Sequence, residues 1–203
     1  MIDYYSQHPL YAALIIVLLI ITLFVCFKAF KAASKRNKET RELMNELHRN
    51  NELKNKYSIL TCNSIISSDE EELFIGVGLN LLKRVADKED MAGEFNSLSK
   101  GQKYIYALFN LYSDSRIQMS DFFRANTDPL TSTALEAVKE IFDEEFTDLF
   151  IYEYNAFDEK NEKVSFIKDE VSDTDKKTAP YFSEGTVCKL SGKYIKDNIE
   201  DFI

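Results

Sequence analysis

The chain is poor in the residues that build metal sites and tight turns. It has no tryptophan, two histidines, three cysteines, three prolines and six glycines in 203 residues. No Cys/His pair has metal-ligand spacing, so we expect no metal or other cofactor, and Cys62 and Cys188 are predicted to be small buried side chains. Few residues break helices, and strand-like alternation is scarce. These features predict an all-α fold.

A long apolar run stands near the start of the chain. Residues 10–27 read LYAALIIVLLIITLFVCF, 18 residues without charge, proline or glycine. At 1.5 Å per residue such a helix covers roughly 27 Å, close to the thickness of the hydrocarbon layer of a bilayer. A buried helix of a soluble domain is the alternative, but its exposed edge would usually carry a polar residue. We predict one transmembrane helix over 10–27.

The charges beside this run predict its orientation. Residues 1–9 contain no Lys or Arg, whereas a cluster of cations follows the run. The positive-inside rule therefore places residues 1–9 outside the cell and the rest of the chain in the cytoplasm. The first residues, MIDYYSQ, lack the basic start of a cleaved signal peptide. We predict a single-pass protein of the cell membrane, in contact with the lipid bilayer, whose membrane-interface residues are Lys28, Lys31, Lys35 and Arg36.

Charge also divides the remaining chain. Residues 28–56 carry nine Lys/Arg against four Asp/Glu, and residues 57–203 carry sixteen against twenty-nine. We predict a basic, helical juxtamembrane stalk over 28–56 that continues the membrane helix, followed by an acidic cytosolic domain over 57–203. The stalk's cations suit anionic lipid headgroups, or they only determine topology. The acidic domain disfavours direct binding of nucleic acid and suits a basic protein partner.

Helical periodicity predicts five to seven helices in the domain. Gly76 and Gly78 fall within one of them, where small residues allow close helix approach better than they form a phosphate loop. A turn is predicted at Thr127–Pro129, and a charged loop is predicted after 173. The predicted helices cover about 67–86, 97–115, 119–124, 131–154, 161–173 and the closing stretch 186–203.

The helix predicted from Thr131 has two contrasting faces. Its apolar positions share one side, and acidic residues fill the other. A purely solvated helix face is one explanation of these acids, and a surface for a basic partner is the other. The candidate partner-binding residues are Glu140, Asp143, Glu144, Glu145 and Asp148.

Three stretches within residues 98–141 form a recognisable pattern: Tyr106-Ala107-Leu108, Asp121-Phe122-Phe123 and Ala134-Leu135-Glu136-Ala137. This segment resembles the core motif of a bacterial family of small acidic helical proteins, otherwise a domain of unknown function, whose named example is a DNA-mimic protein. The closing YIKDNIEDFI is similar to the family's tail. The resemblance implies an all-helical domain and an acidic surface that imitates the phosphates of a DNA duplex.

This chain also departs from the family. Residues 114–118 read DSRIQ where the family usually has an Asn-Gly-Gly turn, so no role of that turn is carried over. The matching residues are packing residues more than chemical groups. A fold of this kind would leave the partner open.

Three classes of function are compatible with the sequence. The first is a membrane-anchored, non-catalytic binding module whose acidic helical face engages a basic, DNA-binding or other, cytoplasmic protein. The second is a membrane-associated scaffold or assembly factor that acts through the transmembrane helix and stalk. The third, an enzyme, is disfavoured because many acidic residues do not indicate an active site unless a pocket or a metal cluster accompanies them. We name no catalytic residue, and the oligomeric state stays open.

Overall fold

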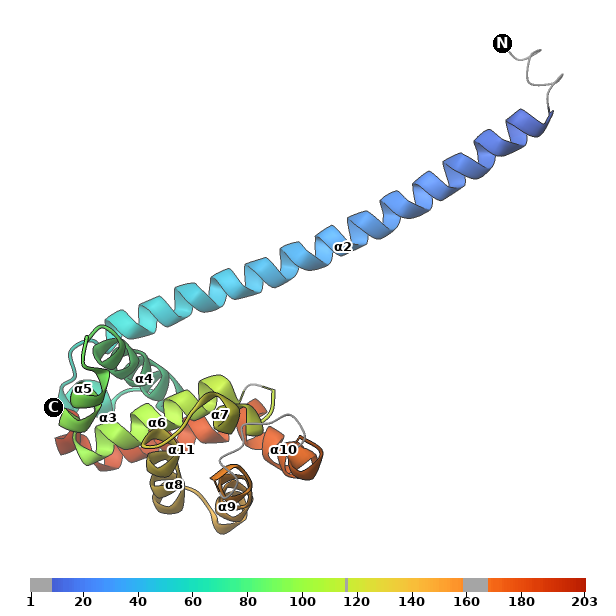
Figure 1. Cartoon of the computed structure of the whole chain (residues 1–203). Coiled ribbons are helices and arrows are strands. Elements are labelled where there is room, and N and C mark those ends of the chain that lie inside the picture. The colour runs from blue at the N-terminus through green and yellow to red at the C-terminus, as the bar shows by residue number, and fades with distance from the viewer. Residues whose placement is uncertain (1–8, 116, 159–167) are drawn as a thin grey trace. The chain divides into compact units, whose positions relative to one another are not determined.

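The computed structural model describes residues 9–115, 117–158 and 168–203 (Figure 1). All regular elements in these ranges are helices, which confirms the predicted all-α fold. Contacts divide the chain into residues 1–49 and a compact unit, Asn50–Ile203. For some residues in these ranges the structure describes the backbone but not the side chain: 9–21, 23, 25, 26, 29, 32–36, 39, 158 and 168–170.

Helix α2 (Pro9–Lys56) covers the predicted membrane helix and the predicted stalk without interruption. Its 48 residues extend about 70 Å at the α-helical rise. The stalk therefore continues the preceding helix, as predicted. Among the side chains that the structure describes, no helix has an apolar stretch long enough to cross a membrane. Most side chains of the predicted span 10–27, and residues 1–8 of the predicted external tail, lie outside the described residues.

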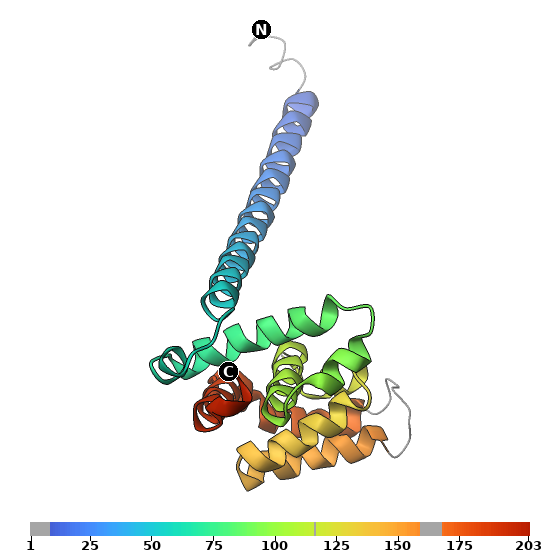
Figure 2. The same cartoon turned by 90° about the vertical axis from the view of Figure 1, so that its left-hand side faces the viewer.

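Three helices form the centre of the compact unit and pack against one another: α4 (Glu70–Ala86), α6 (Lys100–Asp114) and α11 (Thr186–Asp197) (Figures 1 and 2). Side-chain caps fix where the first two begin. The Asp69 carboxylate accepts the N–H groups of Glu71 and Glu72, and the Ser99 hydroxyl accepts that of Gln102. These caps satisfy backbone donors that a helix start leaves free. The helices predicted near 67–86 and 97–115 are confirmed.

Glycines allow the central helices to approach closely. A Cβ atom on Gly78 would overlap the ring of Phe109 on α6, and one on Gly76 would overlap the ring of Tyr57. The prediction that these glycines serve helix packing is thus confirmed. Gly192 on α11 is the most constrained, because its Cβ would overlap the backbone of Glu70. A backbone cannot move aside as a flexible side chain can, so this position requires glycine.

Shorter helices complete the unit, and several differ from the predictions. Helices α3 (Cys62–Ile66) and α5 (Met91–Ser97) were not predicted, and Cys62 is exposed rather than buried because it begins α3 away from the core. Cys188 is buried, as predicted. With α7 (Ser120–Ala125), α8 (Leu130–Ile141), α9 (Glu144–Asp158) and α10 (Lys168–Ser183), the described part of the domain exceeds the predicted five to seven helices.

The charged loop predicted after 173 is wrong, because α10 continues to Ser183. Its buried face combines Val171 with the polar residues Thr174, Asp175 and Thr178. Each of these residues is at most 7% exposed. The buried positions have helical spacing, but most of them are polar. A search for helical spacing of apolar residues could therefore not predict this part of α10. Of the helix predicted over 161–173, residues 161–167 lie outside the described residues.

Aromatic side chains fill the space between α7 and α9. Phe123 on α7 lies 5.0 Å from Phe150 and 5.6 Å from Phe157, measured between ring centroids. Phe122 and Phe146 are fully buried beside them. Such ring pairs contribute about 0.5–1.5 kcal/mol each beyond their buried area. This packing fixes the position of α9, the helix that carries most of the predicted binding residues.

Candidate functional site

The acidic stretch predicted as one helix is divided between two. Helix α8 ends at Ile141, Phe142 adopts an extended conformation, and α9 begins at Glu144. The single helix over 131–154 is therefore wrong. Asp143 explains the break, since its carboxylate accepts the N–H of Phe146 at 2.8 Å and so caps α9. The acids in the first turn of α9 also favour a helix start, where the dipole is positive.

Two of the five predicted binding residues have partners within the domain. The Glu140 carboxylate forms an ion pair with Lys100, at 2.6 Å, and accepts the hydroxyl of Tyr194 at 3.4 Å. Asp143 caps α9 and accepts the hydroxyl of Tyr181 at 3.3 Å. The hydrogen bond that the Lys100 ammonium donates to the Glu140 carboxylate raises the pKa of Lys100. These two acids hold α8, α9 and their neighbours together, so a free acidic surface does not centre on them.

The other three predicted residues form an exposed acidic surface, which we call the α9 acidic edge: Glu144, Glu145 and Asp148. They lie in the first two turns of α9, with Glu144 and Asp148 four residues apart on one side. No ion pair joins any of them to a cation that the structure describes. Glu145 is also close enough to Tyr181 to contribute to raising that residue's pKa, although burial is the larger cause. The α9 acidic edge is therefore available to an external cation.

The predicted membrane-interface residues belong to α2. Lys28 and Lys31 are exposed, and the Lys28 ammonium lies 4.8 Å from the ring centroid of Phe24. A cation over an aromatic face is a favourable pair. The side chains of Lys35 and Arg36 lie outside the described residues.

A buried acid on α9 was not predicted. Glu153 is fully buried, and neither of its carboxylate oxygens has a hydrogen-bond partner among the described residues. Burial is the main cause that raises its pKa, to about 9, and the nearby Asp175 carboxylate raises it further, while Arg124 opposes the shift. Glu153 is therefore protonated at neutral pH. A neutral carboxyl avoids the large cost of burying an unpaired charge.

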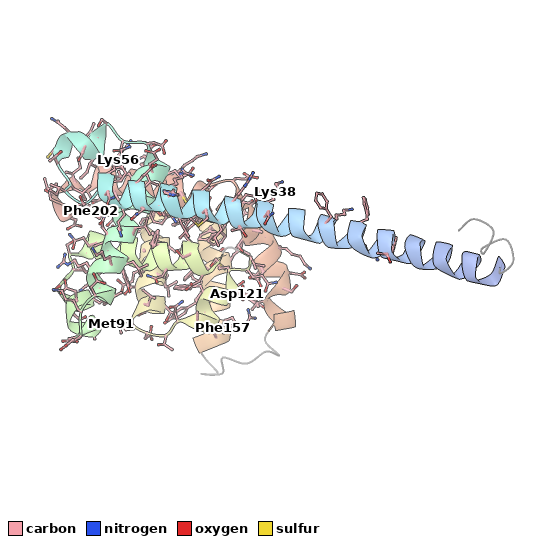
Figure 3. The ribbon with its side chains drawn as sticks, turned by 90° about the horizontal axis from the view of Figure 1, so that it is seen from above. Lys38, Lys56, Met91, Asp121, Phe157 and Phe202 are labelled. Carbon is pink, nitrogen blue, oxygen red and sulfur yellow. The ribbon has the colours of Figure 1, made fainter. Side chains whose placement is uncertain are left out.

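Helices α7 and α10 supply the surroundings of Glu153. Asp175 accepts the backbone N–H of Ser120 at 2.9 Å and its hydroxyl at 2.8 Å. The Arg124 guanidinium donates to the Ser120 hydroxyl at 2.6 Å and to Asp121 at 3.2 Å, and it lies 5.4 Å from the ring centroid of Phe157. Figure 3 labels Asp121 of α7 and Phe157 of α9. One guanidinium nitrogen of Arg124 is buried without an acceptor among the described residues. We call Ser120, Glu153 and Asp175 the buried polar cluster. Arg124 and Asp121 border it, with side chains that are 23% and 42% exposed.

The buried polar cluster has carboxyl groups that could exchange a proton, but both of its acids are shielded from solvent. Glu153 and Asp175 are at most 5% exposed, and neither described pocket includes them. Among the described residues, no group of three or more His, Cys, Asp or Glu is placed to hold a metal ion.

The sequence contained one signal for the burial of Glu153. Glu153 stands at helical spacing from Phe146, Phe150 and Phe157, an acid on an otherwise aromatic face.

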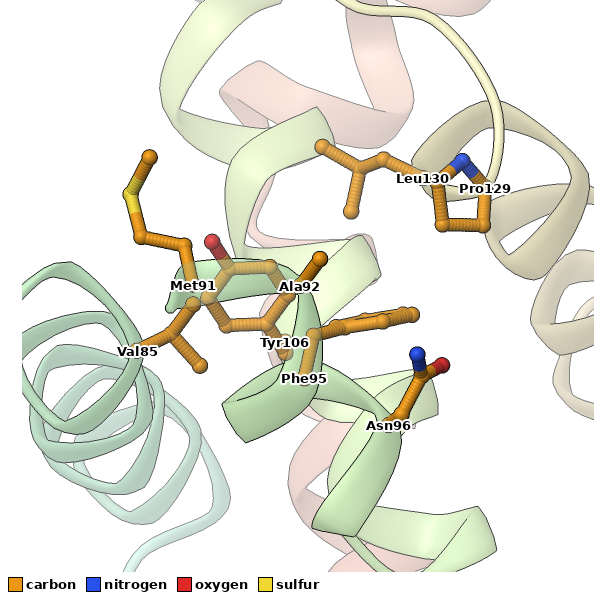
Figure 4. A pocket seen from close by; sticks show the side chains of 8 residues that line it. All are labelled: Val85, Met91, Ala92, Phe95, Asn96, Tyr106, Pro129 and Leu130. Carbon is orange, nitrogen blue, oxygen red and sulfur yellow. The ribbon is translucent and has the colours of Figure 1, made fainter. Parts of the chain in front are cut away.

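Two of the pockets on the compact unit are lined entirely by residues that the structure describes. A polar one, of about 310 Å³, is lined by residues of α4 that include Asn80 and Arg84, together with Tyr57, Gln102 and Phe202. A smaller one, of about 240 Å³, has largely apolar walls (Figure 4). The walls of this second pocket, which we call the α5 pocket, are Val85, Met91, Ala92, Phe95, Asn96, Tyr106, Pro129 and Leu130.

Comparison of the chain with protein-family models, with curated proteins and with solved structures finds no match.

Proposed function

We propose that this protein is a membrane-anchored, non-catalytic binding module whose α9 acidic edge engages a basic cytoplasmic protein. The observation that carries the proposal is that Glu144, Glu145 and Asp148 are exposed without an ion pair to any described cation, in a domain with thirteen more acids than cations. Complementary charge accelerates encounter and selects partners by sign. The resemblance to a DNA-mimic family points to a DNA-binding protein as one such partner.

The anchor is part of the same proposal. Its support is the 18-residue apolar run at 10–27 and the continuous helical backbone of α2 through it. We propose that residues 1–9 lie outside the cell, that Lys28, Lys31, Lys35 and Arg36 meet the inner headgroups, and that the domain is cytoplasmic. The chain should stay in membranes washed at high salt or high pH. Release by salt alone, or digestion of the C-terminal part by protease added outside whole cells, would contradict the anchor.

Capture from cytoplasm tests the binding function. The full chain in detergent is immobilised, and bound proteins are identified at 0.05 and 0.5 M salt. We expect a basic protein that is recovered at low salt and lost at high salt. The variant Glu144→Gln/Glu145→Gln/Asp148→Asn, here the edge variant, should lose it. The matched control Asp173→Asn/Asp197→Asn/Glu200→Gln removes the same charge from other exposed positions and should keep it. Equal recovery by all three chains would refute the proposal.

A second function, a scaffold that acts through α2, is favoured by one observation. Leu43, Met44 and Leu47 are each at least 50% exposed on the stalk, more apolar surface than a solvated helix needs. If these residues form the contact, Leu43→Ser/Met44→Ser/Leu47→Ser should lose the partner, and the edge variant should keep it. The binding-module proposal predicts the reverse pattern.

A further inference from the structure

The α5 pocket has the composition of a site for an apolar group. Four elements or connections form it: the end of α4 with Val85, helix α5 with Met91 and Phe95, α6 with Tyr106, and the start of α8. Figure 4 shows Met91 and Val85 on one side of the opening and Pro129 with Leu130 on the other. Phe95 and Tyr106 are 5.6 Å apart between ring centroids and form an aromatic wall.

The volume of the pocket limits its occupant. About 240 Å³ is below the range of roughly 300–1,000 Å³ typical of sites for drug-sized ligands. It exceeds the roughly 150 Å³ of an engineered cavity that binds benzene. One large side chain of a partner, such as Phe or Leu, would therefore fill it. Met91 is 57% exposed at the opening, and an unbranched methionine can adapt to such a side chain.

Acidic residues stand next to lining residues of this apolar site in the sequence. Asp87, Glu89 and Asp90 immediately precede Met91, and Asp128 precedes Pro129; all four are exposed. Hydrogen bonds from Thr131 and Ser132 lower the pKa of Asp128, which keeps it ionised.

Three lysines offset part of the charge of these four acids. Lys83 stands in the last turn of α4, Lys88 stands among the acids, and the Lys103 ammonium lies 5.9 Å from the ring centroid of Phe95. Arg84 is paired with Glu94. The rim is therefore acidic while the walls are apolar, so an apolar side chain flanked by cations complements both.

From this complementarity we infer that the α5 pocket is a docking site for one aromatic or aliphatic side chain on a basic segment of a protein partner. The inference rests on the proposed function and deepens it, because it adds an anchor point to recognition by charge. Charge alone selects basic partners poorly, whereas a filled apolar pocket discriminates between basic segments by one side chain.

Two synthetic pentapeptides test the inference: one with Phe between two pairs of Lys, and one with Ala in place of Phe. Binding is measured by fluorescence anisotropy to the full chain in nanodiscs of phosphatidylcholine, a lipid without net charge. Wild type should bind the Phe peptide about tenfold more tightly than the Ala peptide, the preference expected for burying an aromatic ring. Added salt should weaken both peptides.

Variants locate the preference. Ala92→Phe places a ring in the pocket and should abolish the tenfold preference, whereas the matched control Ala86→Phe, at an exposed position outside the pocket, should keep it. Met91→Ala removes an exposed part of the wall and should reduce the preference. Circular dichroism establishes that each variant is folded. If Ala92→Phe unfolds the domain, Met91→Ala decides the question.

The remaining outcomes either refute the docking site or distinguish its failure from a failure of the proposed function. Equal affinity of wild type for both peptides, or an unchanged preference in Met91→Ala, would refute the pocket while partner capture through the α9 acidic edge could still succeed. Competition by decanoate would identify an acyl chain as the occupant and refute a protein segment. A Phe preference in a chain that captures no basic protein would refute the proposed function and support the pocket alone.

Discussion

The two ends of helix α9 hold acidic residues in opposite environments. At its start, Glu144, Glu145 and Asp148 are exposed and without a described cation, and eight residues after Glu145 the side chain of Glu153 is fully buried. Water solvates the exposed charges at little cost, whereas burial keeps Glu153 neutral at pH 7. The same residue type therefore supplies an external field at one end and a proton-dependent contact at the other. Composition alone cannot distinguish the two.

The largest expected effect is on the pH dependence of stability. Folding raises the pKa of Glu153 from 4.5 to about 9, so the folded state binds a proton that the unfolded state lacks between these values. Stability conferred by this proton is fully present below pH 4.5 and is lost as pH rises toward 9, by up to about 1.4 kcal/mol per unit. Relative to Glu153→Gln, wild type should lose up to about 4 kcal/mol between pH 5 and 8.

Urea unfolding at pH 5, 6.5 and 8 measures this difference. Glu145→Gln, an exposed acid on the same helix, serves as the control and should follow wild type across the range. Parallel stability curves for wild type and Glu153→Gln would show that Glu153 has an ordinary pKa, and the contrast between the two ends of α9 would fail.

Asp175→Asn should have the next largest effect. Both carboxylate oxygens of Asp175 accept hydrogen bonds from Ser120, and an amide can replace only one acceptor. We expect a loss of about 1–3 kcal/mol from the unmet buried donor. Removal of the like charge should also lower the pKa of Glu153, so the pH-dependent loss of stability should level off at a lower pH than in wild type. An Asp175→Asn variant whose stability levels off at the same pH as wild type would show that the two carboxyls do not interact.

Asp143→Ala should cost about 1 kcal/mol, because it removes the cap of α9 and the acceptor of the Tyr181 hydroxyl. Thermal unfolding measures the loss. Asp143→Asn, which keeps a capping oxygen, should recover most of the stability. If Ala and Asn variants are equally stable, Asp143 belongs with the exposed acids rather than with the structural ones.

The smallest expected effect is that of the edge variant on stability. Neutralising Glu144, Glu145 and Asp148 removes exposed charges without described ion pairs, although the first two favour the positive start of α9. The free energy of unfolding should therefore fall by less than about 1 kcal/mol. Urea unfolding beside the control Asp173→Asn/Asp197→Asn/Glu200→Gln measures it. A loss of several kcal/mol would mean that the α9 acidic edge stabilises the fold instead of serving a partner.

Much of the fold could be predicted because local rules determined it. Asp69 and Ser99 cap helices whose apolar residues recur with regular helical spacing. Gly76 and Gly78 lie where a side chain would overlap a packed aromatic ring. The break at Phe142 could not be predicted from apolar spacing. That spacing continues across it, and the cap from Asp143 outweighs the continuing pattern.

The candidate site was less predictable than the fold. The stretch 140–148 was identified by its acidity, but the ion pair of Glu140 with Lys100 joins residues 40 positions apart, which a local pattern does not reveal. Glu153 was missed because an acid is read as a solvent-facing residue unless its neighbours are considered. The α5 pocket is lined by residues of α4, α5, α6 and the start of α8, which tertiary packing brings together and no spacing in the chain reveals.

Site-specific photocrosslinking is the sharpest test of whether the α9 acidic edge binds a basic protein, because an adduct forms only where the two proteins are in contact. A benzophenone amino acid is placed at Asp148 on the α9 acidic edge or, as the control, at the exposed Glu200, and cells producing the full chain are irradiated. The account predicts that position 148 yields an adduct with a basic cytoplasmic protein and that position 200 does not. The account would be contradicted by no adduct from position 148, or by the same adduct from both positions.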